Sequence, residues 1–206
     1  MAKEGLCFFL PFLIIAVIFF FLFNSSLNMT FIHLGVASFI FGCLIMLFFR
    51  DPERKVPSGD NLIVSPADGK VVNIENNNDM KVVSIFLSVF DIHINRIPVA
   101  GVIRRLKYKK GKFKAAFNKE ASDINERFEI EIKTDKGNVI VHQIAGVLAR
   151  RVVCHLQEGQ AVKTGDRFGL IRFGSRVDLF LPLSTELEVA KGQRVKGAST
   201  IIGRLI

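Results

Sequence analysis

Two long runs without a charged residue stand at the start of the chain, and they constrain its fold more than any other feature. Leu6–Phe23 has 18 residues, Met29–Phe49 has 21, and the polar segment Asn24–Asn28 separates them. A helix rises about 1.5 Å per residue, so each run comes close to spanning the roughly 30 Å of bilayer hydrocarbon. The sequence therefore predicts a transmembrane helical hairpin over residues 1–49, with spans at about 6–23 and 29–49.

A cleaved signal peptide is the alternative interpretation of the first run. The run is long for the apolar core of such a peptide, no A-x-A cleavage site follows it, and a second run comes directly after it.

Charges at the ends of the hairpin predict its orientation. Lys3 precedes it, Arg50, Arg54 and Lys55 follow it, and the connector has no Lys or Arg. The positive-inside rule then places both ends, and the domain that follows, on the cytoplasmic side of the cell membrane.

The net charge of +9 falls entirely after residue 49, because Lys3 and Glu4 cancel in the first part of the chain. A basic domain attracts anions, and beside a membrane the nearest anions are lipid headgroups. No nucleic-acid recognition motif accompanies the charge, so no nucleic-acid partner is expected. His93, His142 and His155 lack the spacing of a metal-binding set, and no metal is expected.

Residues 50–60 are predicted to be a polar linker, and residues 61–206 to form one domain with mostly period-two hydrophobicity. The strands that this pattern predicts are Ile63–Val64, Val71–Ile74, Lys81–Phe90, Phe128–Lys133, Val139–Ile144 and Val177–Leu181, the last ended by Pro182. Phe113–Asn125 is the one candidate for a short helix. EGQAVK (158–163) and KGQRVK (191–196) echo each other, and each should form a turn that leads into a strand. We predict a mainly β domain, sandwich-like or barrel-like with short helices, behind a two-helix anchor.

Five segments carry a resemblance to a known family. They are FFRDP (Phe48–Pro52), SPADGK (Ser65–Lys70), FDIHINRIP (Phe90–Pro98), QIAGVLARRVV (Gln143–Val153) and FGSRVDLFLP (Phe173–Pro182). In this order, behind a membrane anchor, they resemble the phosphatidylserine decarboxylases, and most closely the short, membrane-proximal form of that family. The resemblance covers most of the predicted β domain.

The resemblance implies a self-processing enzyme that converts phosphatidylserine into phosphatidylethanolamine and carbon dioxide. The chain would break between Gly174 and Ser175, which form its only Gly-Ser pair. Ser175 would become an N-terminal pyruvoyl group, a covalent cofactor made from the chain itself. The two fragments, 1–174 and 175–206, would stay associated as one folded unit.

The chemistry of the reaction agrees with this implication. Decarboxylation of an amino acid leaves a carbanion, which needs an electron sink that ordinary side chains do not supply. A pyruvoyl ketone can form a Schiff base with the substrate amine, and the conjugated carbonyl accepts the electrons. Gly174 has no Cβ, so it permits close attack by the Ser175 hydroxyl and unusual backbone angles. An ordinary hairpin turn is the alternative role of this pair, because Gly and Ser are both frequent in turns.

The resemblance also implies which residues carry protons. Asp68 in PADG matches the family's carboxylate, and His93 in DIH matches a catalytic histidine. The long form of the family has a second histidine where this chain has Arg96, and an arginine stays protonated and cannot act as a base. The base for self-cleavage is therefore either His93 or Asp68, and Arg96 is expected to bind the substrate's carboxylate or phosphate. The further candidates for substrate binding are Arg150, Arg151 and Arg176.

Other functions stay open at the level of sequence. The same chemistry could act on another serine-headgroup lipid, such as an ether lipid of the archaetidylserine type, because the lipid backbone is read by the shape of a pocket. A tethered basic β-domain could instead bind anionic lipid without catalysis. The sequence gives no interface, so a homo-oligomer also stays open.

Overall fold

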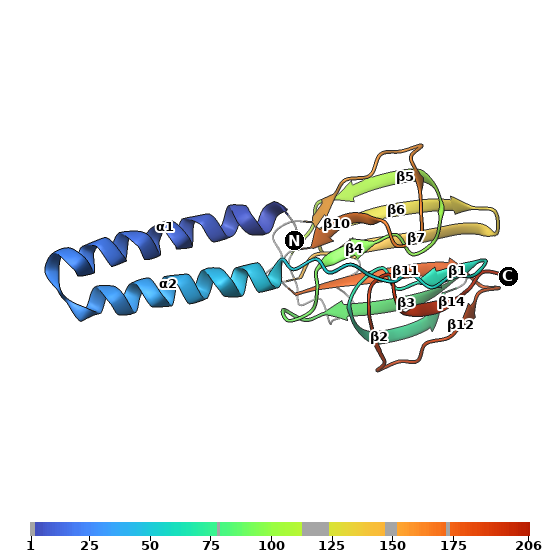
Figure 1. The fold of residues 1–206 in the computed structure, drawn as a ribbon. Helices are drawn as coiled ribbons and strands as arrows, with labels where there is room; N and C mark the ends of the chain where they lie inside the picture. Colours follow the sequence, from blue (N-terminus) through green and yellow to red (C-terminus); the bar gives the residue numbers. More distant parts are fainter. Residues whose placement is uncertain (1–2, 78, 113–123, 147–151, 172–173) are drawn as a thin grey trace. The chain divides into compact units, whose positions relative to one another are not determined.

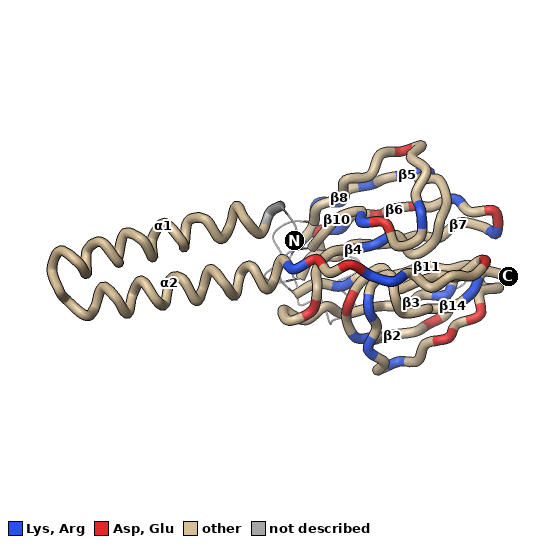
Figure 2. Tube along the Cα trace, in the orientation of Figure 1, with Lys and Arg blue, Asp and Glu red and all other residues tan. Residues whose placement is uncertain are grey.

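The computed structural model describes residues 3–77, 79–112, 124–146, 152–171 and 174–206. The chain divides into two compact units, Met1–Pro52 and Glu53–Ile206. The first is helical and almost free of charge, whereas the second is built from strands and carries the charged side chains (Figures 1 and 2).

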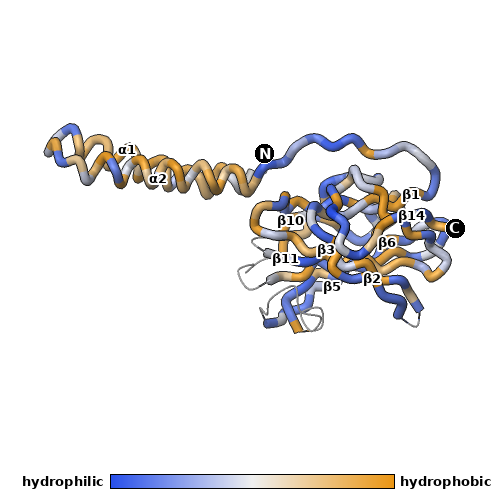
Figure 3. The backbone as a smooth tube through the Cα atoms, turned by 90° about the horizontal axis from the view of Figure 1, so that it is seen from below, coloured by the Kyte–Doolittle hydropathy of each residue, from blue (hydrophilic) through white to orange (hydrophobic). Residues whose placement is uncertain are grey.

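Two antiparallel helices form the first unit, α1 (Lys3–Ser26) and α2 (Met29–Phe48). Leu27 turns the chain with a φ of +53°, and the Asn28 side chain caps α2 by accepting a hydrogen bond from the Thr30 N–H at 3.0 Å. Both helices are long and apolar enough to cross a membrane, and Figure 3 shows hydrophobic residues along most of their length, with hydrophilic residues at the connector. The predicted pair of apolar helices is confirmed, with α1 longer than the predicted span at both ends.

Small residues on α2 let the two helices approach closely. A Cβ at Gly35 would lie 3.3 Å from the Ala16 carbonyl oxygen, and one at Gly42 would lie 3.0 Å from the Phe9 ring. Ser38 Oγ donates a hydrogen bond to the Phe12 carbonyl at 2.9 Å. Close backbone contact and interhelical hydrogen bonds are what hold helices together in lipid, where the hydrophobic effect does not act between them.

Antiparallel strands in three sheets form the second unit. Their bounds are β1 (Leu62–Val64), β2 (Gly69–Asn76), β3 (Met80–Leu87), β4 (Ile94–Arg96), β5 (Gly101–Lys109), β6 (Arg127–Thr134), β7 (Gly137–Ile144), β8 (Val152–Cys154), β9 (Ala161–Val162), β10 (Arg167–Ile171), β11 (Ser175–Pro182), β12 (Glu186–Leu187), β13 (Arg194–Val195) and β14 (Ile201–Arg204). The large sheet has the order β13-β2-β3-β11-β7-β6-β5-β9, and the two small sheets have the orders β1-β14-β12 and β4-β10-β8. The mainly β prediction is confirmed.

The core lies between the inner face of the curled large sheet and the two small sheets (Figure 1). Alternate residues of β11 point into it, so Val177, Leu179 and Leu181 are fully buried there. Phe168 from β10 and Ile202 from β14 close it from the other side. Ser175 has the same parity as Val177, and the alternation therefore directs its side chain toward the core as well.

The β domain consists of two halves with the same arrangement of strands, and each half contributes to the large sheet and forms one small sheet. Gly159 and Gly192 are the second residues of the echoed segments and have φ of +81° and +93°; their N–H groups donate to the Ile103 and Val71 carbonyls, each at 2.8 Å. The short strands that follow, β9 and β13, border opposite edges of the large sheet. The predicted turn followed by a strand is confirmed in both places. One half of the domain comprises β1–β3 and β11–β14, and the other, β4–β10, lies between them in sequence.

One predicted strand differs from the structure at its end, and the predicted helix lies almost entirely outside the described residues. The predicted strand Lys81–Phe90 is wrong at its end, because β3 stops at Leu87 and Ser88–Asp91 form a tight turn closed by hydrogen bonds to the Asp91 carboxylate. The candidate helix Phe113–Asn125 lies outside the described residues except at its last two positions.

Candidate active site

Ser175 is the first residue of the central strand β11, between β3 and β7. Its side chain is fully buried, and within the described residues its Oγ has no hydrogen-bond partner. Gly174 precedes it with a φ of +58°, in the left-handed region that favours glycine. An unpaired buried hydroxyl costs free energy, so it calls for a reason other than packing. Attack on the adjacent Gly174 carbonyl would be such a reason.

His93 brings an imidazole to this peptide from the segment before β4. The Gly174 N–H donates to His93 Nε2 at 3.3 Å, and His93 Nδ1 lies 2.8 Å from the Asp91 carbonyl oxygen. A carbonyl can only accept, so Nδ1 carries the proton and Nε2 presents its lone pair to Gly174. The ring is 2% exposed. A neutral histidine thus stands beside the predicted cleavage point with its basic nitrogen directed at it.

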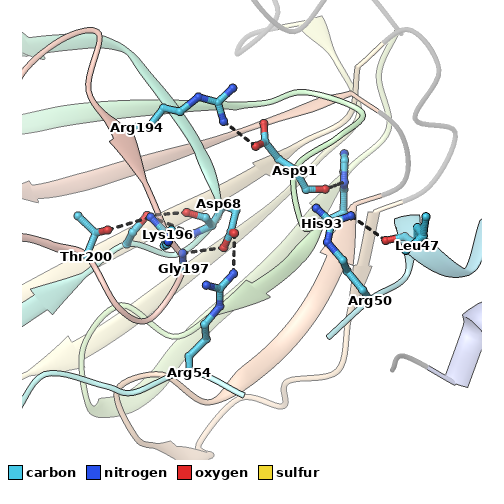
Figure 4. A network of polar contacts seen from close by, with 12 residues as sticks. Leu47, Arg50, Arg54, Asp68, Asp91, His93, Arg194, Lys196, Gly197 and Thr200 are labelled. Atoms are coloured by element: carbon cyan, nitrogen blue, oxygen red, sulfur yellow. Dashed lines mark hydrogen bonds and ion pairs between the residues drawn. The ribbon is translucent and has the colours of Figure 1, made fainter. Parts of the chain in front are cut away.

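Asp68 lies in the turn just before β2, at the same end of the large sheet. Its carboxylate accepts hydrogen bonds from Arg54 at 2.6 Å and from the Gly197 N–H at 2.8 Å (Figure 4). Burial raises the pKa of Asp68, and the hydrogen bond from Gly197 and the charge of Arg54 only partly oppose this. The register places Lys70, Phe86 and Arg176 side by side across β2, β3 and β11, so the backbones near Asp68 and Ser175 are about 10 Å apart. Asp68 therefore belongs to the surroundings of the site and does not contact Ser175 directly.

Asp91 organises the segment that carries His93. Its Oδ2 accepts from the Ser88 N–H and hydroxyl, at 2.8 and 2.7 Å, and its Oδ1 accepts from Arg194 at 3.0 Å. Its main-chain oxygen holds the His93 ring (Figure 4). Sequence reasoning assigned no role to Asp91 or to the Arg54–Asp68 pair. The Asp-x-His spacing was the available signal for Asp91, whereas nothing in the sequence connects Arg54 to Asp68.

A second polar pair joins β7 of the large sheet to β4 of a small sheet, and sequence reasoning also missed it. Gln143 Nε2 donates to Asn95 Oδ1 at 2.7 Å, and both side chains are fully buried. Within the described residues Asn95 Nδ2 and Gln143 Oε1 have no partner. Gln143 is the β7 register partner of Val177, which stands two residues from Ser175 on the same face. Asn95 Nδ2, Gln143 Oε1 and Ser175 Oγ are thus buried polar atoms, from β4, β7 and β11, that lack a partner among the described residues.

The predicted substrate-binding arginines are dispersed. Arg176 is buried on the face of β11 opposite to Ser175, where its Nε and Nη2 bind the Asp178 carboxylate at 2.6 and 2.9 Å. Arg96 is buried at the other end of β4 from His93 and donates to the Gly165 carbonyl at 3.2 Å. Residues 150 and 151 lie outside the described residues. The structure therefore brings together Ser175, Gly174 and His93, while substrate roles for the arginines stay predictions.

The internal repeat separates what the fold requires from what chemistry requires. Gly69 and Gly101 occupy equivalent places, because a Cβ at either would collide with a carbonyl of the neighbouring strand. Directly before them stand Asp68 and Ala100, so the turn itself does not need a carboxylate. By the same register Ser175, paired with Leu87 at the end of β3, corresponds to Gly137 in the β6–β7 hairpin. The Asp68 carboxylate and the Ser175 hydroxyl are therefore present in only one of the two halves, which favours a functional role for both.

The opposite face of the large sheet carries a polar row that includes His142. Register pairs place Asp178, His142 and Glu129 side by side, and the His142 ring packs on Phe180 with centroids 4.4 Å apart. Burial lowers the pKa of His142 to about 4, although the Glu129 and Asp178 carboxylates act in the other direction. His142 is therefore neutral at pH 7.

This shift predicts a pH dependence of folding stability. An unfolded histidine has a pKa near 6.5, so between pH 6.5 and 4 the unfolded chain binds a proton that folded His142 does not. The contribution of His142 is complete above pH 6.5 and is lost as the pH falls toward 4, with a slope of at most about 1.4 kcal/mol per pH unit. His142→Phe keeps a ring against Phe180 and should make the midpoint of thermal unfolding less dependent on pH over this range. An unchanged pH profile, equal to that of the exposed control His155→Gln, would contradict the prediction.

Comparisons with known proteins identify the family of the chain. The family model for phosphatidylserine decarboxylase matches residues 41–203. A phosphatidylserine decarboxylase proenzyme of Ehrlichia chaffeensis is 48% identical over 181 residues, which cover 84% of this chain and 80% of the relative. Proenzymes of the same name from Wolbachia pipientis and Rickettsia akari are each 49% identical, over 83% and 82% of this chain and 80% and 78% of their own lengths. The chain therefore belongs to the phosphatidylserine decarboxylase family.

Proposed function

We propose that this chain is a proenzyme that breaks between Gly174 and Ser175 and then decarboxylates phosphatidylserine to phosphatidylethanolamine. The observation that carries the proposal is a buried Ser175 hydroxyl, without a partner among the described residues, next to a Gly174 whose N–H donates to Nε2 of a neutral His93. The naming of the relatives as proenzymes of this decarboxylase supports it.

Self-cleavage begins when Ser175 Oγ attacks the Gly174 carbonyl carbon. His93 Nε2 takes the hydroxyl proton after exchanging its hydrogen bond with the Gly174 N–H, which is long enough at 3.3 Å to be released. The C–N bond breaks, the Ser175 nitrogen gains a proton, and an ester joins the two residues. Removal of the Ser175 α-proton expels Gly174 as a carboxylate and leaves dehydroalanine. One water then adds and one ammonia leaves, which makes the pyruvoyl group.

The residues present fit a pyruvoyl group at the start of β11. Its position is buried, on the same face of the large sheet as Gln143, whose side chain is hydrogen-bonded to Asn95. When formed, the group supplies the carbonyl that withdraws electrons from the substrate carbon losing carbon dioxide. The backbone of β11 pairs with eight residues of β3 and five of β7, so we expect fragment 175–206 to stay in the sheet after cleavage.

Asp68 and the arginines have the remaining proposed roles. Burial raises the pKa of Asp68, which favours exchange of a proton by its carboxylate, and Arg54 fixes the direction of that carboxylate. Arg96, Arg150 and Arg151 are the candidates for binding the anionic headgroup. The hairpin α1–α2 would cross the membrane twice, with Glu53–Ile206 on the cytoplasmic side because the basic residues flank its ends and not its connector.

The test uses the full chain purified in mild detergent. Intact mass should show two chains, and the smaller should match Ser175–Ile206 less the mass of one ammonia molecule. The same sample, placed in phosphatidylserine vesicles, should release carbon dioxide from carboxyl-labelled lipid. A break at another peptide bond would overturn the assignment of Ser175, and processed protein without release of carbon dioxide would overturn the proposed reaction.

A further inference from the structure

The turn between β3 and β4 presents two apolar side chains to the outside. Phe90 is 82% exposed, the highest value of any large apolar side chain in the described residues, and its neighbour Val89 is 42% exposed. Most exposed apolar residues of this chain lie on α1 and α2, where lipid is the expected solvent. An apolar pair of this size at the tip of a β turn therefore indicates a contact surface.

The turn is rigid, which separates it from an ordinary mobile loop tip. Asp91 N–H donates to the Ser88 carbonyl at 3.0 Å, and the Asp91 carboxylate receives the Ser88 N–H and hydroxyl. Arg194 from β13 binds the same carboxylate at 3.0 Å. Val89 and Phe90 are thus held in place at the tip, and little conformational entropy would be lost when they contact a partner.

The same segment reaches the candidate active site at both of its ends. Leu87, directly before the turn, is the register partner of Ser175, and His93, two residues after Asp91, accepts from Gly174. Figure 4 shows Asp91 between Arg194 and His93. Whatever the turn binds is therefore brought to the end of the domain where the chain is proposed to react.

Two basic side chains lie next to the turn. Arg194 on β13 binds Asp91 of the turn, and its register partner on β2 is Lys70, which pairs with Phe86 near the end of β3; both side chains are exposed. Lys191 and Lys196, in the segment that contains β13, are also exposed. The nearby carboxylates of Asp68 and Asp91 are each paired with an arginine. An apolar tip with a basic border is the combination that binds the surface of an anionic bilayer, because the apolar groups enter the acyl boundary and the cations meet the headgroups.

We propose that Val89 and Phe90 insert into the interfacial layer of an anionic membrane and seat the site-bearing end of the domain on the lipid surface. This inference rests on the proposed function. If the site acts on phosphatidylserine, docking through this turn would let the lipid headgroup enter the site while the lipid stays in the bilayer. A protein partner is the competing occupant, and the test distinguishes the two.

The absence of tryptophan from the sequence makes a direct test available. Phe90→Trp gives the full chain a single indole, which can be read in nanodiscs that contain phosphatidylserine with or without brominated acyl chains. The matched control is Leu183→Trp, because Leu183 is 46% exposed and follows Pro182 at the opposite end of β11 from Ser175. We expect brominated lipid to quench the first indole strongly and the second only weakly. Equal quenching of both would overturn the proposal and leave a protein partner for the turn.

A kinetic variant makes the test independent of the indole. Val89→Ser with Phe90→Ser should leave self-cleavage and kcat unchanged and raise the apparent KM for lipid in vesicles by about tenfold, as expected for the loss of one partly buried aromatic anchor. Unchanged KM would contradict docking through this turn. If the parent protein released no carbon dioxide, the proposed function would fall, while the quenching comparison would still decide the docking.

Discussion

Replacing Ser175 with Ala should leave one intact chain of 206 residues that releases no carbon dioxide from phosphatidylserine. The side chain at this position is buried at the start of β11, and only a hydroxyl there can attack the Gly174 carbonyl. Without the attack no ester forms, no bond breaks and no electron-accepting carbonyl is made, so both processing and decarboxylation should be lost completely. Intact mass reports the first loss and carbon dioxide release the second.

Ser84→Ala is the matched control for this variant. Ser84 lies on β3 of the same sheet, is fully buried, and has an Oγ without a partner within the described residues. Removal of an unpaired buried hydroxyl should be close to neutral for stability, so Ser84→Ala should be processed and active. A two-chain product from Ser175→Ala would assign the break to another residue, and loss of processing in both variants would point to folding instead of chemistry.

Replacing His93 with Gln should slow self-cleavage by a factor on the order of 10²–10⁴, the usual contribution of a positioned general base. Glutamine is close to histidine in size, and its amide oxygen can still accept from the Gly174 N–H that His93 holds at 3.3 Å. It cannot take a proton from Ser175. The variant therefore keeps the contact and removes the basicity. Uncleaved chain should accumulate in a time course of newly synthesised protein.

His155→Gln provides the comparison, because His155 is exposed and stands outside the site. It should be processed at the rate of the parent chain. Normal processing of His93→Gln would show that His93 only positions Gly174 and is not the base. A raised pH that restores cleavage in the Gln variant would indicate direct attack by ionised serine, which agrees with the loss of a base.

Much of the fold could be predicted from local sequence patterns. The two helices were predicted from the length of the two uncharged runs. Strands β6, β7 and β11 were predicted from short apolar and alternating segments, and their observed bounds are close to the predicted ones. The prediction for β3 ran past Leu87, because Ser88–Phe90 are as apolar on average as the strand before them. What ends the strand is the Asp91 carboxylate, which gathers hydrogen bonds from Ser88 and Arg194.

The internal repeat of the β domain could be predicted only in small part from sequence patterns. Two six-residue segments suggested it. The rest of the repeat is visible only in the structure, in glycines that face carbonyls of a neighbouring strand and in strands that pair with partners distant in sequence. Equivalence of Asp68 with Ala100, and of Ser175 with Gly137, follows from register alone. No alternation or composition relates these pairs.

The sequence by itself determined the two apolar helices and the β class of the domain, because these depend on composition and periodicity. Its resemblance to a known family implied the candidates Gly174, Ser175, Asp68 and His93. Only the tertiary structure decided which candidates meet. Gly174 reaches His93 across 81 positions of the chain, while Asp68 turns instead to Arg54 and Gly197, the latter 129 positions away. Such contacts depend on how antiparallel strands from both halves align in one sheet, and that alignment is fixed by burial of the whole core and by no single segment.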